Sequence, residues 1–176
     1  DRMSAAAYMA ELVDKFTEEE HEAPAIYHTL TRTLAWLSTS SQPEMAVRYL
    51  ETRVLEEAGY QPELQRCQAC KRELQPELNG FSPTAGGAIC SHCLANYGDT
   101  RPLSVNALKV LRLLQADDRT QLQRLRLPPT LHRELETLMR AYLQHITEQQ
   151  LRSVGFIESV RATPSPRTPT QEATTA

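Results

Sequence analysis

Two closely spaced cysteine pairs limit what this chain can fold into more than any other feature. Cys67 and Cys70 form the first pair, Cys90 and Cys93 form the second, and nineteen residues separate them. Two thiolates three positions apart can bind one side of a tetrahedral ion, and a hairpin can bring a second pair across to complete the shell. Four thiolates leave no coordination position open, so the pattern predicts one structural zinc ion.

The residues between the two pairs favour this interpretation, although other uses of the cysteines stay open. Asn79-Gly80 and Gly86-Gly87 are turn-forming pairs, and glycine accepts backbone conformations that a side chain forbids. Two disulfides are one alternative, with three possible connectivities, and a redox C-x-x-C site is another. His92, which lies between the ligands of the second pair, is an alternative zinc ligand.

Apolar residues on both sides of this segment recur at helical spacing. They predict helices over residues 5–16, 24–37, 43–58, 104–114 and 131–146. Pro24, Ser104 and Thr130 suit helix starts, Gly59 suits a left-handed helix end, and we expect Gly155 to break or kink the last helix. Residues 119–127 are predicted to be an arginine-rich connector. The fold class is therefore mainly α, a helical bundle with an inserted four-cysteine, zinc-ribbon-like module of short strands and turns.

The same punctuation divides the chain into regions. We expect a helical region at 1–60, a zinc-binding module at 61–100, a second helical region at 101–162 that packs with the first, and a disordered tail at 163–176. The chain starts with Asp1 and is helical almost from its first residue, which indicates the C-terminal portion of a longer protein. No apolar run suits a membrane span, and no secretory signal is recognisable, so neither membrane insertion nor export is predicted.

Charge is distributed unevenly although the net charge is only −3. Residues 1–60 carry 11 acidic and 5 basic side chains, whereas residues 101–162 carry 6 acidic and 10 basic ones. A basic half can approach phosphates or a carboxylate-rich peptide that the acidic half would repel. A solvated helix surface without a ligand is the other interpretation of the same counts.

No catalytic motif is present in the sequence. It contains no glycine-rich phosphate loop, no G-x-S-x-G and no H-E-x-x-H, and its five histidines are scattered. A zinc-dependent enzyme that modifies nucleic acids would need an open metal position, which four cysteines do not leave. We therefore expect a binding protein rather than an enzyme.

Several segments, taken in order, resemble the RecO family of bacterial DNA repair proteins. The resemblance extends from about residue 4 to residue 160. It rests on the segments 6–13, 48–51, 59–64, Phe81-Ser82-Pro83-x-x-Gly86-Gly87 with the cysteine pairs, Tyr142-Leu143-x-His145, and Leu151-Arg152-Ser153-x-x-Phe156-Ile157. Lys71 and Leu94 stand where a glycine often follows such cysteine pairs, so we expect less regular turns there.

The resemblance implies a recombination mediator in the cytoplasm, associated with the nucleoid. Such a protein binds single- and double-stranded DNA, anneals complementary strands, and acts with RecR to load RecA onto DNA covered by single-stranded DNA-binding protein (SSB). This chain would be its C-terminal helical and zinc-bearing region, which follows an OB-fold domain. The alternative is a zinc-stabilised structural or interaction domain of a larger protein, without DNA binding of its own.

The resemblance also suggests which basic residues contact these partners. Arg48 is the candidate for the carboxylates of the acidic SSB tail, and a helix pair with Glu44 is its alternative role. The candidates for DNA contact are Arg112, Arg124, Arg126, Arg133, Arg140 and Arg152.

Overall fold

The computed structural model describes residues 2–17 and 24–162, with side chains up to residue 149. The predicted tail at 163–176 and the side chain of Arg152 lie outside the described residues. Six α-helices, three short strands and one 3₁₀ helix occur in the described part of the chain, in the order α1 (Arg2–Phe16), α2 (Pro24–Thr39), α3 (Pro43–Glu57), β1 (Asn79–Ser82), β2 (Gly87–Ile89), η1 (Ser91–Asn96), β3 (Arg101–Leu103), α4 (Val105–Gln115), α5 (Arg119–Arg124) and α6 (Pro129–Ala162). The predicted fold class, mainly α with an inserted four-cysteine module, is confirmed.

Most helix boundaries follow from local chemistry. Pro24 and Pro43 occupy first helical positions, where the missing N–H of proline would have no partner in any case. Ser104 precedes α4, and its Oγ accepts a hydrogen bond from the backbone N–H of Ala107 at 3.1 Å. Gly59 follows α3 with φ +79°, the left-handed conformation that ends helices. Among the described helices, none combines the length and the apolar character that a membrane span requires.

Three boundaries in the second half differ from expectation. α6 begins at Pro129, because the carbonyl of Pro128 already accepts from the N–H of His132 at 3.2 Å, so Thr130 is not the cap. The arginine-rich connector contains the short helix α5, which Asp118 caps by accepting from the N–H of Gln121 at 3.0 Å. α6 continues through Gly155 to Ala162, so the glycine does not end the helix.

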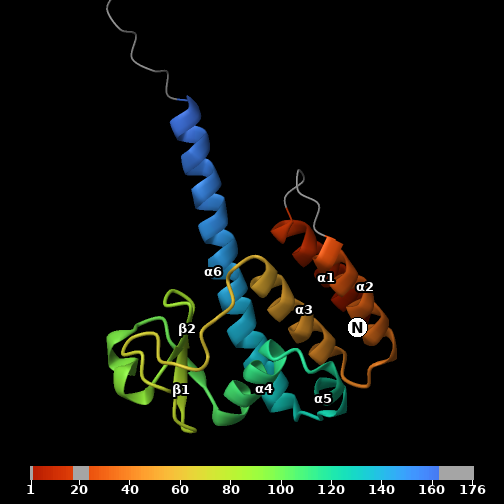
Figure 1. Cartoon of the computed structure of the whole chain (residues 1–176), viewed down its shortest axis with the longest axis horizontal. Helices are drawn as coiled ribbons and strands as arrows, with labels where there is room; N and C mark the ends of the chain where they lie inside the picture. The colour runs from red at the N-terminus through yellow and green to blue at the C-terminus, as the bar shows by residue number, and fades with distance from the viewer. Residues whose placement is uncertain (1, 18–23, 163–176) are drawn as a thin grey trace, which may run out of the picture.

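Helix α3 lies at the centre of the bundle and carries much of the core. It contacts α1 and α2 on one side and α4 and α6 on the other (Figure 1). Met45, Leu50 and Leu55 are fully buried on this helix. Burying an aliphatic side chain stabilises a fold by about 1.5–3 kcal/mol. The helices before and after the cysteine module therefore pack around a shared central helix.

The three strands form a small antiparallel sheet in the order β2-β1-β3. Phe81 of the central strand is opposite Ala88 on one side and Arg101 on the other. Its buried ring packs edge-to-face on Tyr142 of α6, with ring centroids 5.4 Å apart. This aromatic contact fixes the sheet to the longest helix.

The segment that leads from α3 into the cysteine module is also fixed to the helices. Backbone carbonyls at alternate residues of this segment accept hydrogen bonds from three side chains of α4 and α6. These are Tyr142 Oη to Tyr60 O at 2.9 Å, Gln115 Nε2 to Pro62 O at 2.7 Å, and Arg112 Nε to Leu64 O at 2.9 Å. The module therefore docks on the bundle through polar contacts as well as apolar ones.

Replacement of Gly87 by alanine is expected to destabilise the module by about 1–3 kcal/mol, the usual cost of inserting an extra methyl group into a packed site. Gly87 pairs with Glu63 across a short parallel bridge, and a Cβ at Gly87 would lie only 2.3 Å from the Glu63 carbonyl oxygen. Denaturant unfolding of both variants measures the effect. Gly98→Ala is the matched control, because nothing lies within 4 Å of a Cβ there. Equal stability of the two variants would contradict this prediction.

Candidate functional site

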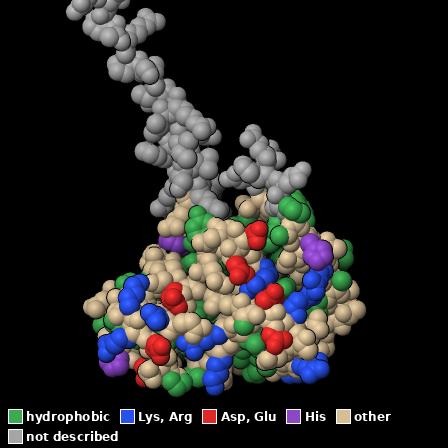
Figure 2. Space-filling model, viewed as in Figure 1, with side chains coloured by type: hydrophobic (Ala, Val, Ile, Leu, Met, Phe, Trp, Pro, Cys, Tyr) green, Lys and Arg blue, Asp and Glu red, His purple; other side chains and the backbone are tan. Residues whose placement is uncertain are grey.

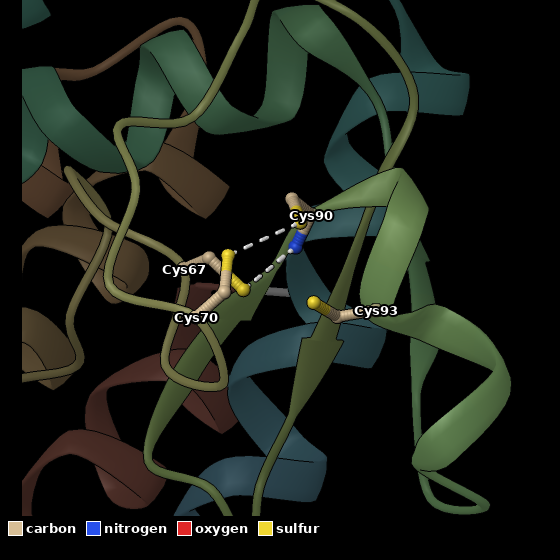
Figure 3. Close-up of side chains that lie close together, drawn as sticks. All are labelled: Cys67, Cys70, Cys90 and Cys93. Carbon is tan, nitrogen blue, oxygen red and sulfur yellow. Dashed lines mark hydrogen bonds between the residues drawn. The ribbon is translucent and has the colours of Figure 1, made fainter.

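The four cysteines of the two predicted pairs converge on one point. Their Sγ atoms all lie within 4.8 Å of one another, and Figure 3 shows the four side chains around a common centre. The Sγ atoms of Cys70 and Cys90 are 3.8 Å apart. A tetrahedral ion with metal–sulfur bonds of about 2.3 Å separates its sulfur ligands by about 3.8 Å. The cluster is therefore compatible with one structural metal ion.

Backbone hydrogen bonds shape the two turns that carry these thiols. The N–H of Lys71 donates to Cys67 O and the N–H of Cys67 donates to Arg72 O, both at 2.8 Å. Lys71 has φ +62°, the left-handed conformation that glycine usually supplies in such a turn. The N–H of Cys90 donates to Cys67 Sγ at 3.3 Å, which links the two turns. Lys71 therefore takes the backbone conformation that a glycine would take in this turn.

Neighbouring groups set the thiol pKa values unequally. A hydrogen bond from Arg72 lowers the pKa of Cys70 to about 6. Hydrogen bonding with Cys90 and burial raise the pKa of Cys93 to about 12. Against the effect of its burial, backbone hydrogen bonds lower the pKa of Cys67, and burial raises the pKa of Cys90. Binding of a cation would therefore release protons from Cys90 and Cys93.

The geometry of the cluster bears on the alternative uses of the cysteines. All four thiols are free, so the structure contains none of the three disulfide pairings. His92 is exposed, and its Nδ1 lies 3.2 Å from Ser91 Oγ. Among the described residues, the cluster that could hold a metal ion consists of the four cysteines and does not include His92. Arg72 was not identified from the sequence as a residue that contacts the cluster. Its position two residues after Cys70 could have indicated this contact.

Arg48 lies inside the helical bundle rather than on its surface. It is only 8% exposed, and its Nη2 lies 3.0 Å from Oε1 of Glu51, which is fully buried. Its acidic partner is thus Glu51, one turn along α3, and not Glu44. The hydroxyl of Tyr8 on α1 donates to the same Glu51 oxygen at 2.7 Å. Burial raises the pKa of Glu51, and the positive charge of Arg48 opposes that shift.

The predicted DNA-contact arginines occupy different environments. Arg112 is half-buried and donates to Leu64 O, whereas Arg124 and Arg126 are exposed near the end of α5. Arg133 and Arg140 are exposed on α6 and line a groove together with Arg101 of β3, which sequence reasoning missed. On the face drawn in Figure 2, Lys and Arg side chains are interspersed with Asp and Glu rather than gathered in one patch. Among the predicted arginines whose side chains are described, Arg133 and Arg140 line a common groove, next to Arg101.

The sequence of this chain is similar to those of known proteins over most of its length. Residues 1–154 match the family described as "Recombination protein O C terminal". A DNA repair protein RecO from a Roseiflexus species is 39% identical over 161 residues, which cover 92% of this chain and 57% of that protein. The RecO protein of Dehalococcoides mccartyi is 37% identical over 156 residues, with coverage of 89% and 61%. That of Symbiobacterium thermophilum is 30% identical over 164 residues, with coverage of 92% and 65%.

These similarities extend over both helical regions and the cysteine module. The chain spans less than two thirds of the length of the relatives that it matches. The match across residues 1–154, with relatives up to 39% identical, shows the family: the chain belongs to the RecO family of DNA repair proteins.

Proposed function

We propose that this chain is the helical and metal-bearing part of a recombination mediator. In this role the protein binds single- and double-stranded DNA and SSB, assists strand annealing, and acts with RecR to load RecA. The family match over residues 1–154 carries this proposal. The ten basic side chains at residues 101–162, against six acidic ones, are consistent with contact to a polyanion.

The metal of the cysteine cluster is proposed to be one zinc ion, with Cys67, Cys70, Cys90 and Cys93 as its ligands. A set of four thiolates is typical of structural zinc sites. Such an ion would hold the two turns together and leave no position for water or substrate. We accordingly propose a protein that acts by binding, without catalytic turnover, in the cytoplasm at the nucleoid.

The experiment that tests DNA binding is a titration of a fluorescein-labelled single-stranded oligonucleotide, followed by anisotropy at 50 and 200 mM salt. We expect binding at 50 mM salt that weakens by at least about tenfold at 200 mM, because each phosphate contact releases counterions. A labelled duplex is titrated in parallel. Absence of binding to either oligonucleotide at 50 mM salt would contradict DNA binding by this chain.

One observation favours the alternative of a structural or interaction domain without its own DNA binding. Arg48 and Arg112, two of the candidate contact residues, are engaged in internal contacts with Glu51 and Leu64 O. Under this alternative, DNA contact belongs to a part of the protein outside this chain. The salt titration separates the two proposals.

A further inference from the structure

Two neighbouring hollows on one side of α6 share Arg140 and Gln144 in their linings, and one is more basic while the other is more apolar. The first part is lined by three arginines and one carboxylate, with Thr137, Ala141 and Gln144; the charged residues are Arg101, Arg133, Arg140 and Glu136. Arg140 and Gln144 also line the second part, where Tyr8 and Leu12 of α1 and Leu143 join them. We call these two hollows together, defined by Arg101, Arg133, Thr137, Arg140, Gln144, Tyr8, Leu12 and Leu143, the α6 groove.

The basic part of the α6 groove retains unpaired positive charge. Among the described residues, no carboxylate pairs with Arg101 or Arg133, and both side chains are exposed. Arg140 pairs with Glu136 at the surface, where side chains 75% and 46% exposed form a weak, easily opened pair. At the margin, Glu134 accepts hydrogen bonds from the N–H and Oγ of Ser104 at 2.7 and 2.9 Å, so its charge is engaged at the start of α4.

The apolar part offers a fixed aromatic ring. The side chain of Tyr8 is 37% exposed, while its hydroxyl is held by Glu51 at 2.7 Å. Leu12 and Leu143 are buried beside it and form the apolar floor. Of the acidic residues that line this part, Glu11 pairs with Lys15 at 2.8 Å, whereas Glu148 accepts a hydrogen bond from the neutral Gln144 at 3.0 Å and keeps its charge.

We propose that the α6 groove binds a single strand of DNA, with the phosphates along Arg101, Arg133 and Arg140 and a base against the ring of Tyr8. Arg133 and Arg140 are seven residues apart, about 10 Å along the helix, which suits a polymer of repeating charge better than one compact anion. A cationic wall beside an aromatic ring is the arrangement that holds unpaired bases, whereas a duplex keeps its bases stacked inside. This inference rests on the proposed function, because it names the surface through which DNA would bind.

The first test removes charge from the groove in the 176-residue chain. The probe is a fluorescein-labelled oligo-dT, and the variant is Arg101→Gln/Arg133→Gln. We expect about tenfold weaker binding and a salt slope lower by about 1.4, because each phosphate contact to a single strand contributes about 0.7. The matched control is Arg32→Gln/Lys109→Gln, which removes two exposed positive charges on α2 and α4 and is expected to bind like wild type.

The second test isolates the aromatic ring. Tyr8→Phe and Tyr8→Leu both lose the hydroxyl that contacts Glu51, and only Tyr8→Leu loses the ring. Stacking of one base on an aromatic side chain corresponds to about fivefold or more in affinity, so we expect Tyr8→Leu to bind oligo-dT at least about fivefold more weakly than Tyr8→Phe. Circular dichroism of both variants confirms that the helices are retained.

The outcomes distinguish failure of this inference from failure of the proposed function. If the wild-type chain does not bind oligo-dT at low salt, the proposed DNA binding fails and the inference fails with it. If wild type binds and Arg101→Gln/Arg133→Gln binds equally well, the groove is wrong while DNA binding stands. A labelled eight-residue acidic peptide provides the remaining comparison, because binding of this peptide in place of oligo-dT would overturn the choice of ligand.

Discussion

Replacement of Cys67 by serine is expected to abolish binding of the proposed zinc ion and to unfold the cysteine module. Cys67 is fully buried, and its Sγ is one of the four clustered sulfurs and also accepts the N–H of Cys90. A structural zinc ion contributes on the order of 10 kcal/mol to the folding of a small module, so loss of one ligand removes most of the free energy that holds the two turns. Zinc per chain, measured by mass spectrometry of the purified protein, and the melting temperature both report the loss.

A neighbouring residue supplies the control for this experiment. His92 is exposed and lies between two of the clustered cysteines, so His92→Ala is expected to keep one zinc ion per chain and the wild-type melting temperature. If Cys67→Ser keeps its zinc and its stability, the four-thiolate site is wrong. Loss of zinc in His92→Ala would instead make the histidine a ligand.

The second large effect is expected for Arg48→Met, which leaves the buried Glu51 carboxylate without its cation. Removal of one partner from a buried ion pair costs about 3–5 kcal/mol, because the remaining charge has lost its compensation. Urea unfolding of variant and wild type at the same pH measures this difference. Lys15→Met is the control, since its pair with Glu11 lies at the surface and its loss is expected to change stability little.

The penalty of Arg48→Met is expected to grow with pH. Burial raises the pKa of Glu51, so the folded state holds this proton more tightly than the unfolded state does. A carboxyl group whose pKa is higher in the folded state stabilises the folded protein at pH values below its pKa in the unfolded state. This stabilisation is lost as the pH rises toward its pKa in the folded state. Without Arg48 the folded pKa rises further, so the difference from wild type is smaller at pH 5 than at pH 8. Arg48→Met/Glu51→Leu is expected to recover most of the stability, and a double variant as unstable as Arg48→Met would contradict this explanation.

Features fixed by short-range chemistry were predictable from the sequence. The cysteine pairs, the cap at Ser104 and the left-handed Gly59 each depend on a few adjacent residues, and the structure shows all three as expected. Thr130 shows the limit of this reasoning, because Thr130 and Pro129 both suit a helix start. The helix begins at Pro129, where the carbonyl of Pro128 accepts the first helical hydrogen bond.

Features that depend on distant residues were not predictable. Arg48 resembles any surface arginine in a helix, and only the approach of Tyr8 on α1 to Glu51 makes this part of α3 a buried polar site. The α6 groove likewise contains both Arg101 and Arg133 because β3 packs beside α6. No pattern of adjacent residues predicts that these two arginines lie close together. Periodicity identifies the apolar face of a helix, but it does not say which polar residues the neighbouring helices will cover.

The carbonyls of Tyr60, Pro62 and Leu64 imply an order of events during synthesis on the ribosome. Their donors on α4 and α6 are translated 48 to 82 residues later. The four cysteines emerge before those donors, so the proposed zinc ion could bind the newly made module while its docking site is still missing. The full set of three hydrogen bonds can form only after Tyr142 has left the ribosome. A nascent chain interrupted before that point would carry the module without its contacts to α6, and the side of α3 that packs on α6 would be open to chaperones and proteases.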